Sequence, residues 1–177
     1  MKKSLILTAA LVFSVMIMAL TPKDDKEETR KKKDPVIKWM SFAEASKLNQ
    51  KHPKKMFIDV FTSWCGWCVQ MDKTTFKDPN VSKYLNDKYY AVKLNAESDA
   101  MISYKGKEMS ERDLAKQIFR ATGYPTTVYL DQEQNLLQPI PGYLEAEMLN
   151  KILHFYGEDS YKTMSWEQFE ANYNNPQ

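Results

Sequence analysis

The sequence predicts an α/β fold in which helices cover a central sheet. Segments with the patterns of strands and of helices alternate along the chain, and such alternation is typical of this class. Towards the C-terminal end the alternation gives way to two strands joined by a short polar turn, which indicates a hairpin. With 43% hydrophobic and 12% aromatic residues among 177, the chain can also bury the core of one domain with extensions.

The individual elements follow from caps and from apolar periodicity. Two capping boxes, Ser41–Glu44 and Ser165–Gln168, each open a helix. The predicted helices span 41–50, 65–73, a segment from 78 onward, a segment from 110 that stops at Gly123, 144–156 and 165–173. The predicted strands span 56–61, 89–95, 126–130 and 136–140. Residues 96–109 are expected to form a polar, irregular connection.

The first 20 residues have the layout of a secretory signal. Basic residues at 2 and 3 precede a nearly unbroken apolar run, Leu5–Leu20. The run is short for a membrane span, although an uncleaved N-terminal anchor stays an alternative. Residues 21–38 carry charges of both signs and few apolar side chains, so they predict a linker. We therefore expect an exported chain with a domain at 39–156 and a C-terminal helical extension at 157–177.

Charge and cysteine content narrow the function classes. Lys and Arg total 25 and Asp and Glu total 23, a balance that gives no support to a nucleic-acid partner. The two cysteines, Cys65 and Cys68, are too few for a disulfide-stapled fold. A zinc site would need four ligands, and neither histidine of the chain stands at ligand spacing. Haem attachment would need histidine where Val69 stands. Two inert buried thiols or a redox dithiol are left.

The position of the cysteines favours the redox dithiol. Cys65 stands where a strand passes into a helix, so unpaired backbone N–H groups and the helix dipole should favour its thiolate. Cys68 lies one turn further on and can reach Cys65. Asp59 lies within the preceding apolar strand; if its side chain is buried rather than solvent-facing, its pKa should be raised and it can exchange a proton with Cys68.

The segment Ile58–Cys68, IDVFTSWCGWC, resembles the active-site strand and turn of the thioredoxin superfamily. Gly123–Thr126 resembles the second signature of that family, where a cis-proline lies beside the dithiol, and Gly142 falls where the family has a glycine before its last helix. The resemblance covers about residues 39–156 and implies a thioredoxin fold with a central mixed sheet. It also implies catalytic roles for Cys65, Cys68 and Asp59. The substrate-binding residues that it implies are Trp64, Gly66, Trp67, Tyr124, Pro125 and Thr126.

A narrower resemblance concerns residues 75–81, TFKDPNV. This segment is similar to one in the C-terminal periplasmic domain of the membrane thiol:disulfide interchange reductase, and to secreted thioredoxin-like proteins of bacterial envelopes. It implies a monomeric disulfide reductase that is periplasmic or attached to the outer side of the inner membrane. Its substrates would be protein disulfides, its electron donor a membrane interchange protein, and it would need no metal or organic cofactor. A thiol oxidase or isomerase of the same fold, and a polypeptide-binding module, are the alternatives.

The chain departs from the family at several positions. Gly66 and Trp67 between the cysteines are neither the Gly-Pro of thioredoxin nor the Pro-His of strong oxidants, and Trp67 is expected to shield the dithiol or to contact substrate. Residues 96–109 are longer than the corresponding connection and predict a surface insertion, with a substrate-facing lid as the alternative. We expect the aromatic residues of the last helix to pack on the domain.

Overall fold

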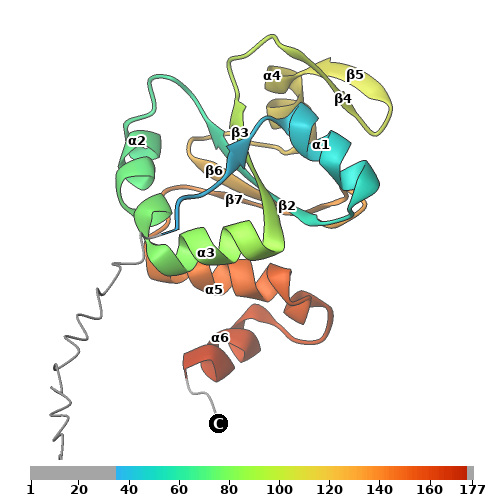
Figure 1. Cartoon of the computed structure of the whole chain (residues 1–177). Helices are drawn as coiled ribbons and strands as arrows, with labels where there is room; N and C mark the ends of the chain where they lie inside the picture. Colours follow the sequence, from blue (N-terminus) through green and yellow to red (C-terminus); the bar gives the residue numbers. More distant parts are fainter. Residues whose placement is uncertain (1–34, 175–177) are drawn as a thin grey trace, which may run out of the picture. The chain divides into compact units, whose positions relative to one another are not determined.

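The computed structural model describes residues 35–174 of the chain (Figure 1). The predicted signal sequence and most of the predicted linker lie outside these residues. Across the described part of the chain, no helix has both the length and the apolar character needed to cross a membrane.

The centre of the domain is a five-stranded mixed sheet, as predicted from the resemblance. Its strands stand in the order β1-β3-β2-β6-β7. The bounds are β1 Trp39–Met40, β2 Lys55–Phe61, β3 Tyr89–Asn95, β6 Thr126–Leu130 and β7 Leu136–Pro141. Strands β1 and β2 pair with β3 in parallel, whereas β6 pairs antiparallel with β2 and β7. Strand β2, which leads to the cysteines, is therefore the central strand.

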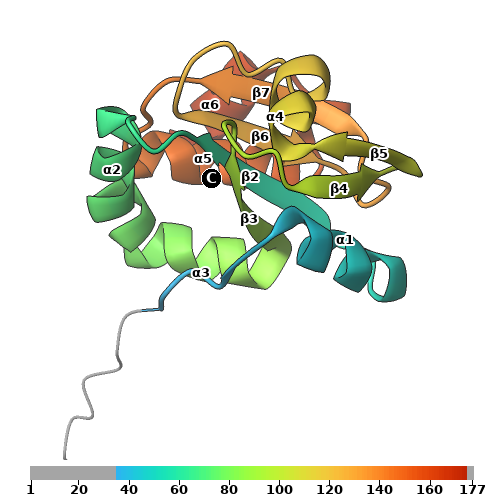
Figure 2. The same ribbon diagram turned by 90° about the horizontal axis from the view of Figure 1, so that it is seen from above.

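Helices cover both faces of this sheet (Figures 1 and 2). The longer ones are α1 Phe42–Lys51, α2 Gly66–Lys73, α3 Pro79–Lys88, α5 Ala146–Gly157 and α6 Trp166–Asn174. Short turns complete the set: α4 Glu111–Asp113, a π-helical turn Leu114–Ile118, and 3-10 turns Thr75–Lys77 and Ser160–Lys162. Helix α1 and the α4 segment lie over one face, and α3 and α5 lie over the other.

The predicted caps are confirmed. The Ser41 hydroxyl accepts the Glu44 N–H, and the Glu44 carboxylate accepts the Ser41 N–H in return. Ser165 and Gln168 form the same reciprocal pair at α6. The helix that starts at Ser110 is shorter than predicted, because Arg120 adopts a positive φ of 54° and turns the chain before it reaches Gly123.

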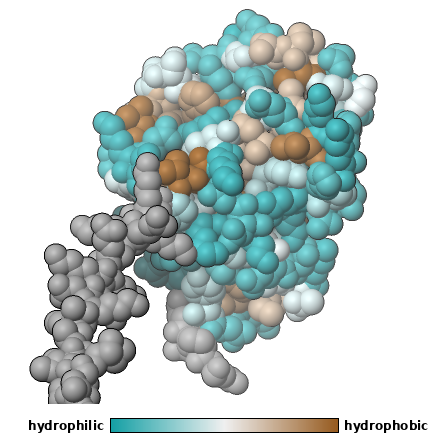
Figure 3. Space-filling model, in the orientation of Figure 1, coloured by the Kyte–Doolittle hydropathy of each residue, from teal (hydrophilic) through white to brown (hydrophobic). Residues whose placement is uncertain are grey.

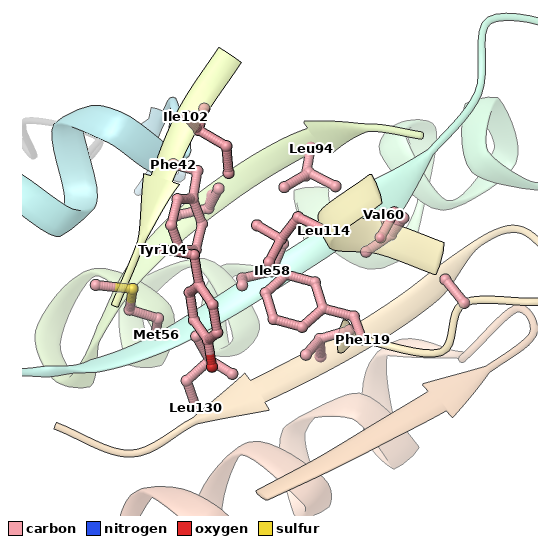
Figure 4. Packing of buried hydrophobic residues seen from close by; sticks show 14 of the residues in the cluster. Phe42, Met56, Ile58, Val60, Leu94, Ile102, Tyr104, Leu114, Phe119 and Leu130 are labelled. Atoms are coloured by element: carbon pink, nitrogen blue, oxygen red, sulfur yellow. The ribbon is translucent and has the colours of Figure 1, made fainter. Parts of the chain in front are cut away.

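Two hydrophobic clusters pack against the two faces of the sheet. Alternation along β2 sends Met56, Ile58 and Val60 to the α1 face, where they meet Phe42 and Phe119 (Figure 4). Phe57 points to the opposite face and joins residues of α2, α3 and α5. Asp59 shares the parity of Phe57, so its carboxyl lies on the α2 side of the sheet. On the outer face drawn in Figure 3, hydrophobic residues occupy only small patches among hydrophilic ones.

The prediction of an irregular connection at residues 96–109 is wrong. Strands β4 Met101–Tyr104 and β5 Lys107–Ser110 form an antiparallel hairpin. Lys105 and Gly106 both have positive φ, as two-residue hairpin turns require. Alternate side chains of β4, Ile102 and Tyr104, enter the α1-side core. Figures 1 and 2 place the hairpin beside α1 and away from α2, so it does not cover the cysteines.

Helix α6 packs on the domain, as expected. The rings of Trp166 and Phe169 contact Phe155 of α5. The ammonium of Lys151 on α5 forms an ion pair with Glu170 of α6 at 3.5 Å. These contacts attach the C-terminal helix to the surface of α5.

Candidate active site

The two cysteines lie at the start of α2, directly after the central strand. Cys65 is the N-cap residue of α2, and its Sγ accepts the backbone N–H of Cys68 at 3.1 Å. The two form a disulfide with a Cα–Cα distance of 5.3 Å. Both side chains are nearly buried. When the pair is reduced, the same N–H group and the positive end of the helix favour a thiolate on Cys65.

The exposed surface around the disulfide is aromatic. Trp64 is 70% exposed and Trp67 is 63% exposed, although large aromatic side chains usually bury most of their area. They stand immediately before the two cysteines. Each cysteine of the nearly buried disulfide is therefore preceded by an exposed indole ring.

Asp59 lies on β2 and is almost completely buried, at 1% exposure, as the buried-strand prediction required. Its Oδ2 atom forms an ion pair with Lys93 Nζ at 2.5 Å, while its Oδ1 has no hydrogen-bond partner among the described residues. Burial raises the pKa of the Asp59 carboxyl, and the neighbouring ammonium opposes only part of this change. The carboxyl can therefore hold a proton at a pH where an exposed aspartate cannot.

Sequence reasoning missed Lys93, which is the charge partner of Asp59. The parallel register of β2 and β3 sets Lys93 directly opposite Asp59, on the same face of the sheet. Its ammonium also bonds the carboxylate of Asp72 on α2 and lies 4.8 Å from the ring centroid of Trp39. A lysine between the apolar residues of β3 is the available signal, but its partner depends on the strand register.

Trp64 is held in place by a second residue that sequence reasoning missed, Glu97. The indole N–H donates to Glu97 Oε1 at 2.9 Å, and the backbone N–H and hydroxyl of Ser63 donate to Oε2. These hydrogen bonds lower the pKa of Glu97. The rings of Trp64 and Tyr124 meet in a T-shaped contact, with their centroids 5.9 Å apart. Glu97 thus joins the end of β3 to the turn before the cysteines, and Trp64 in turn contacts the segment that carries the proline.

The peptide bond between Tyr124 and Pro125 is cis, as predicted. The carbonyl of Pro125 accepts the N–H of Gly142, whose φ of +98° favours glycine. Thr126 is buried, and its hydroxyl donates to the Gly123 carbonyl at 2.7 Å. Its side chain therefore stabilises the proline turn and does not face the surface, whereas Gly66 is exposed beside the disulfide.

This fold, with a disulfide at the start of α2 and a cis-proline, is that of the thioredoxin superfamily. A family model described as "Thioredoxin-like domain" matches residues 42–157, and the chain belongs to that family. The match covers α1 through the end of α5, and so includes strands β2, β3, β6 and β7 of the sheet, the cysteines and the cis-proline.

Among curated proteins, the chain is similar to the thiol:disulfide interchange protein DsbD of Haemophilus influenzae. The two are 28% identical over 102 residues, which are 55% of this chain and only 16% of that protein. Among solved structures, a thioredoxin-fold protein from Helicobacter pylori aligns with a TM-score of 0.55 and 21% identity, over 68% of this chain and 80% of the other. A thioredoxin from Thermus thermophilus aligns with a TM-score of 0.54 and 20% identity, over 71% and 93%. These two likenesses concern the fold.

Proposed function

We propose that the protein is an exported reductase of protein disulfides that works through Cys65 and Cys68. The observation that carries this proposal is the disulfide at the N-terminus of α2, in the same domain as a buried carboxyl with a raised pKa. The predicted secretory signal and the similarity to part of DsbD support a role in the cell envelope.

The reaction begins with the reduced protein. The Cys65 thiolate attacks one sulfur of a substrate disulfide, whose S–S bond breaks and releases one substrate thiolate. A mixed disulfide now joins Cys65 to the other substrate sulfur. Cys68 then attacks Cys65 Sγ, the mixed disulfide breaks, and the second substrate thiolate leaves. Two electrons have passed to the substrate, and the protein holds the Cys65–Cys68 disulfide.

Asp59 serves the second step as a general base. Cys68 must lose its proton before it attacks, and the buried carboxylate of Asp59 can accept that proton. Because the pKa of the Asp59 carboxyl is raised, it lies closer to the pKa of a thiol, and the transfer of a proton from Cys68 costs less free energy. The Lys93 ammonium keeps the carboxylate form accessible in spite of burial.

The residues that surround the cysteines serve substrate binding. Trp64, Gly66 and Trp67 adjoin the cysteines in the chain and Tyr124 contacts Trp64, while the cis-Pro125 turn, supported by Thr126, would place a backbone edge beside a bound polypeptide. The protein acts as a monomer in this scheme. A membrane interchange protein would return electrons to the oxidised pair, because the envelope does not supply a reducing pool.

The reduction potential of the Cys65–Cys68 pair tests the direction of transfer. The full chain is equilibrated in glutathione buffers, and the thiols are then trapped and counted. A reduction potential of about −270 mV supports a reductase, whereas a potential of about −120 mV would mean an oxidase. Replacing both cysteines by serine should abolish disulfide reduction. If the wild type shows no redox activity and the serine variant binds polypeptides as well as the wild type does, the protein is a binding module instead.

A further inference from the structure

A groove runs beside the disulfide on the Trp67 side. It has a volume of about 660 Å³ and is lined by Gly66, Trp67, Gln70, Tyr143 and Glu145. Ligand-binding clefts in proteins have volumes of about 300–1,000 Å³. Gly66 and Trp67 stand between the two cysteines in the chain, so the groove adjoins the turn of α2 that carries the disulfide.

The loop that forms the far wall of the groove is anchored to the end of α2. The hydroxyls of Tyr143 and Thr74 lie 3.1 Å apart and share a hydrogen bond. The Thr75 hydroxyl donates to the carbonyl of Leu144 at 2.6 Å. Both bonds fix the loop that also carries Glu145. The groove is therefore largely preformed, which lowers the entropy lost when a ligand binds.

Two aromatic rings form the apolar part of the groove. The centroids of Trp67 and Tyr143 are 5.4 Å apart, with their planes tilted by 45°. Trp67 is mostly exposed, so the indole is accessible to a ligand. The faces of aromatic rings carry negative potential and attract cations, and tryptophan attracts them most strongly.

The polar part of the groove is acidic. Glu145 is the only charged residue among the five that line it. Within the described part of the chain its carboxylate has no hydrogen bond or ion pair, and it is exposed. The positive end of α5 is close by, but it is equivalent to only about half an elementary charge. The full negative charge of the Glu145 carboxylate exceeds it, so the groove is negative on balance.

These features together favour one kind of occupant. A basic side chain can lie against the rings with its stem and pair its charge with Glu145. A purely apolar side chain would remove water from the carboxylate without replacing its hydrogen bonds, and an acidic one would be repelled. We propose that the groove binds a lysine or arginine side chain of the substrate polypeptide, close in sequence to the disulfide that is reduced. This inference rests on the proposed function.

Matched peptides test this specificity. Peptides with one internal disulfide carry lysine, glutamine, leucine or glutamate at a single position, scanned over two residues on either side of each cysteine. The full-length reduced protein is mixed with each peptide, and the second-order rate constant is divided by that for dithiothreitol. This division removes the effect of each side chain on the intrinsic reactivity of the disulfide. The variants are Glu145→Gln and, as a control with the same charge change, Glu133→Gln in the exposed turn between β6 and β7.

The expected result is a normalised preference for lysine over glutamine of about fivefold or more at the best position. Glu145→Gln should reduce this ratio to about two or less, and Glu133→Gln should leave it unchanged. Equal constants for all four peptides, a preference for leucine or glutamate, or an unchanged ratio in Glu145→Gln would overturn the inference while leaving the reductase intact. If the wild type reduces no peptide, the proposed function fails, and the inference fails with it.

Discussion

Replacing Asp59 by asparagine should stabilise the oxidised protein at neutral and alkaline pH. Burial raises the pKa of this carboxyl above its value in the unfolded chain. The folded protein therefore keeps a proton on Asp59 at pH values where the unfolded chain has lost it. The stability from this proton is complete below the unfolded pKa of about 3.9 and is lost as the pH rises through the raised pKa of the folded state. Asparagine carries no such dependence.

The expected size follows from the contacts of the carboxyl. Each unit by which the folded pKa is raised corresponds to about 1.4 kcal/mol. The unpartnered Oδ1 adds a desolvation penalty of about 1–3 kcal/mol to the charged form, while the Lys93 pair offsets part of it. In the variant, Lys93 keeps Asp72 as its partner, so no buried charge is left alone. We expect Asp59→Asn to gain about 1–3 kcal/mol at pH 8 and almost nothing at pH 4.

Urea denaturation of the oxidised protein, followed by far-ultraviolet circular dichroism between pH 4 and pH 9, measures this difference. Asp99→Asn is the control, because the Asp99 side chain is exposed and its ion pair with Arg112 is a surface pair. Its change should stay below about 1 kcal/mol. The reasoning would be refuted if Asp59→Asn were less stable than wild type at pH 8. It would also be refuted if the two free energies of unfolding differed by the same amount at every pH. The first result would mean that the attraction of Lys93 outweighs burial and that the charged carboxylate stabilises the fold.

Three further substitutions test other contacts of the described residues. Lys93→Met removes the charge partner of Asp59 and should lower the free energy of unfolding by about 1–3 kcal/mol at pH 8. The loss should be smaller at pH 4, because the buried carboxyl can take up a proton there, and urea denaturation at the two pH values measures both changes. Glu97→Gln replaces charge-assisted hydrogen bonds by weaker neutral ones, so the Trp64 indole N–H should exchange faster with solvent in NMR hydrogen-exchange measurements. Lys55→Met removes an ammonium that donates to two carbonyls at the C-terminal end of α5, and should cost about 1–3 kcal/mol in urea denaturation, whereas an unchanged midpoint would mean that other groups replace it.

The framework of the fold was predictable because its signals are local. A capping residue acts on backbone groups within one helical turn, so Ser41, Asp78, Ser110 and Ser165 could be assigned from neighbouring residues alone. The apolar and β-branched runs of β3 and β6 likewise define strands without knowledge of their partners. The hairpin at 101–110 was missed because both of its strands are only four residues long and β5, KEMS, has a single apolar side chain.

The contacts of the site were less predictable because they depend on strand register and on long-range packing. Lys93 meets Asp59 only because β2 and β3 pair in parallel with these two residues opposite each other. A shift of one residue would send the lysine to the other face of the sheet. The bond between Glu97 and Trp64 similarly joins the end of β3 to the turn after β2. Sequence patterns identified the cysteines, Asp59 and the cis-proline, but not the side chains that hold them.

The places where the domain departs from ordinary packing rules also indicate where its chemistry lies. Buried polar atoms without partners occur at Tyr129, Asn150 and Thr62 as well as at Asp59, but the first three side chains are neutral. Among the residues that the structure describes, only Asp59 combines an unpartnered buried oxygen with a carboxyl group, and in the same domain an exposed tryptophan precedes each cysteine of the disulfide. A sequence optimised only for stability would have a neutral residue in place of Asp59 and would bury the two indole rings. Their retention is explained if the first serves proton transfer and the second serves polypeptide binding, because each function needs the property that costs stability.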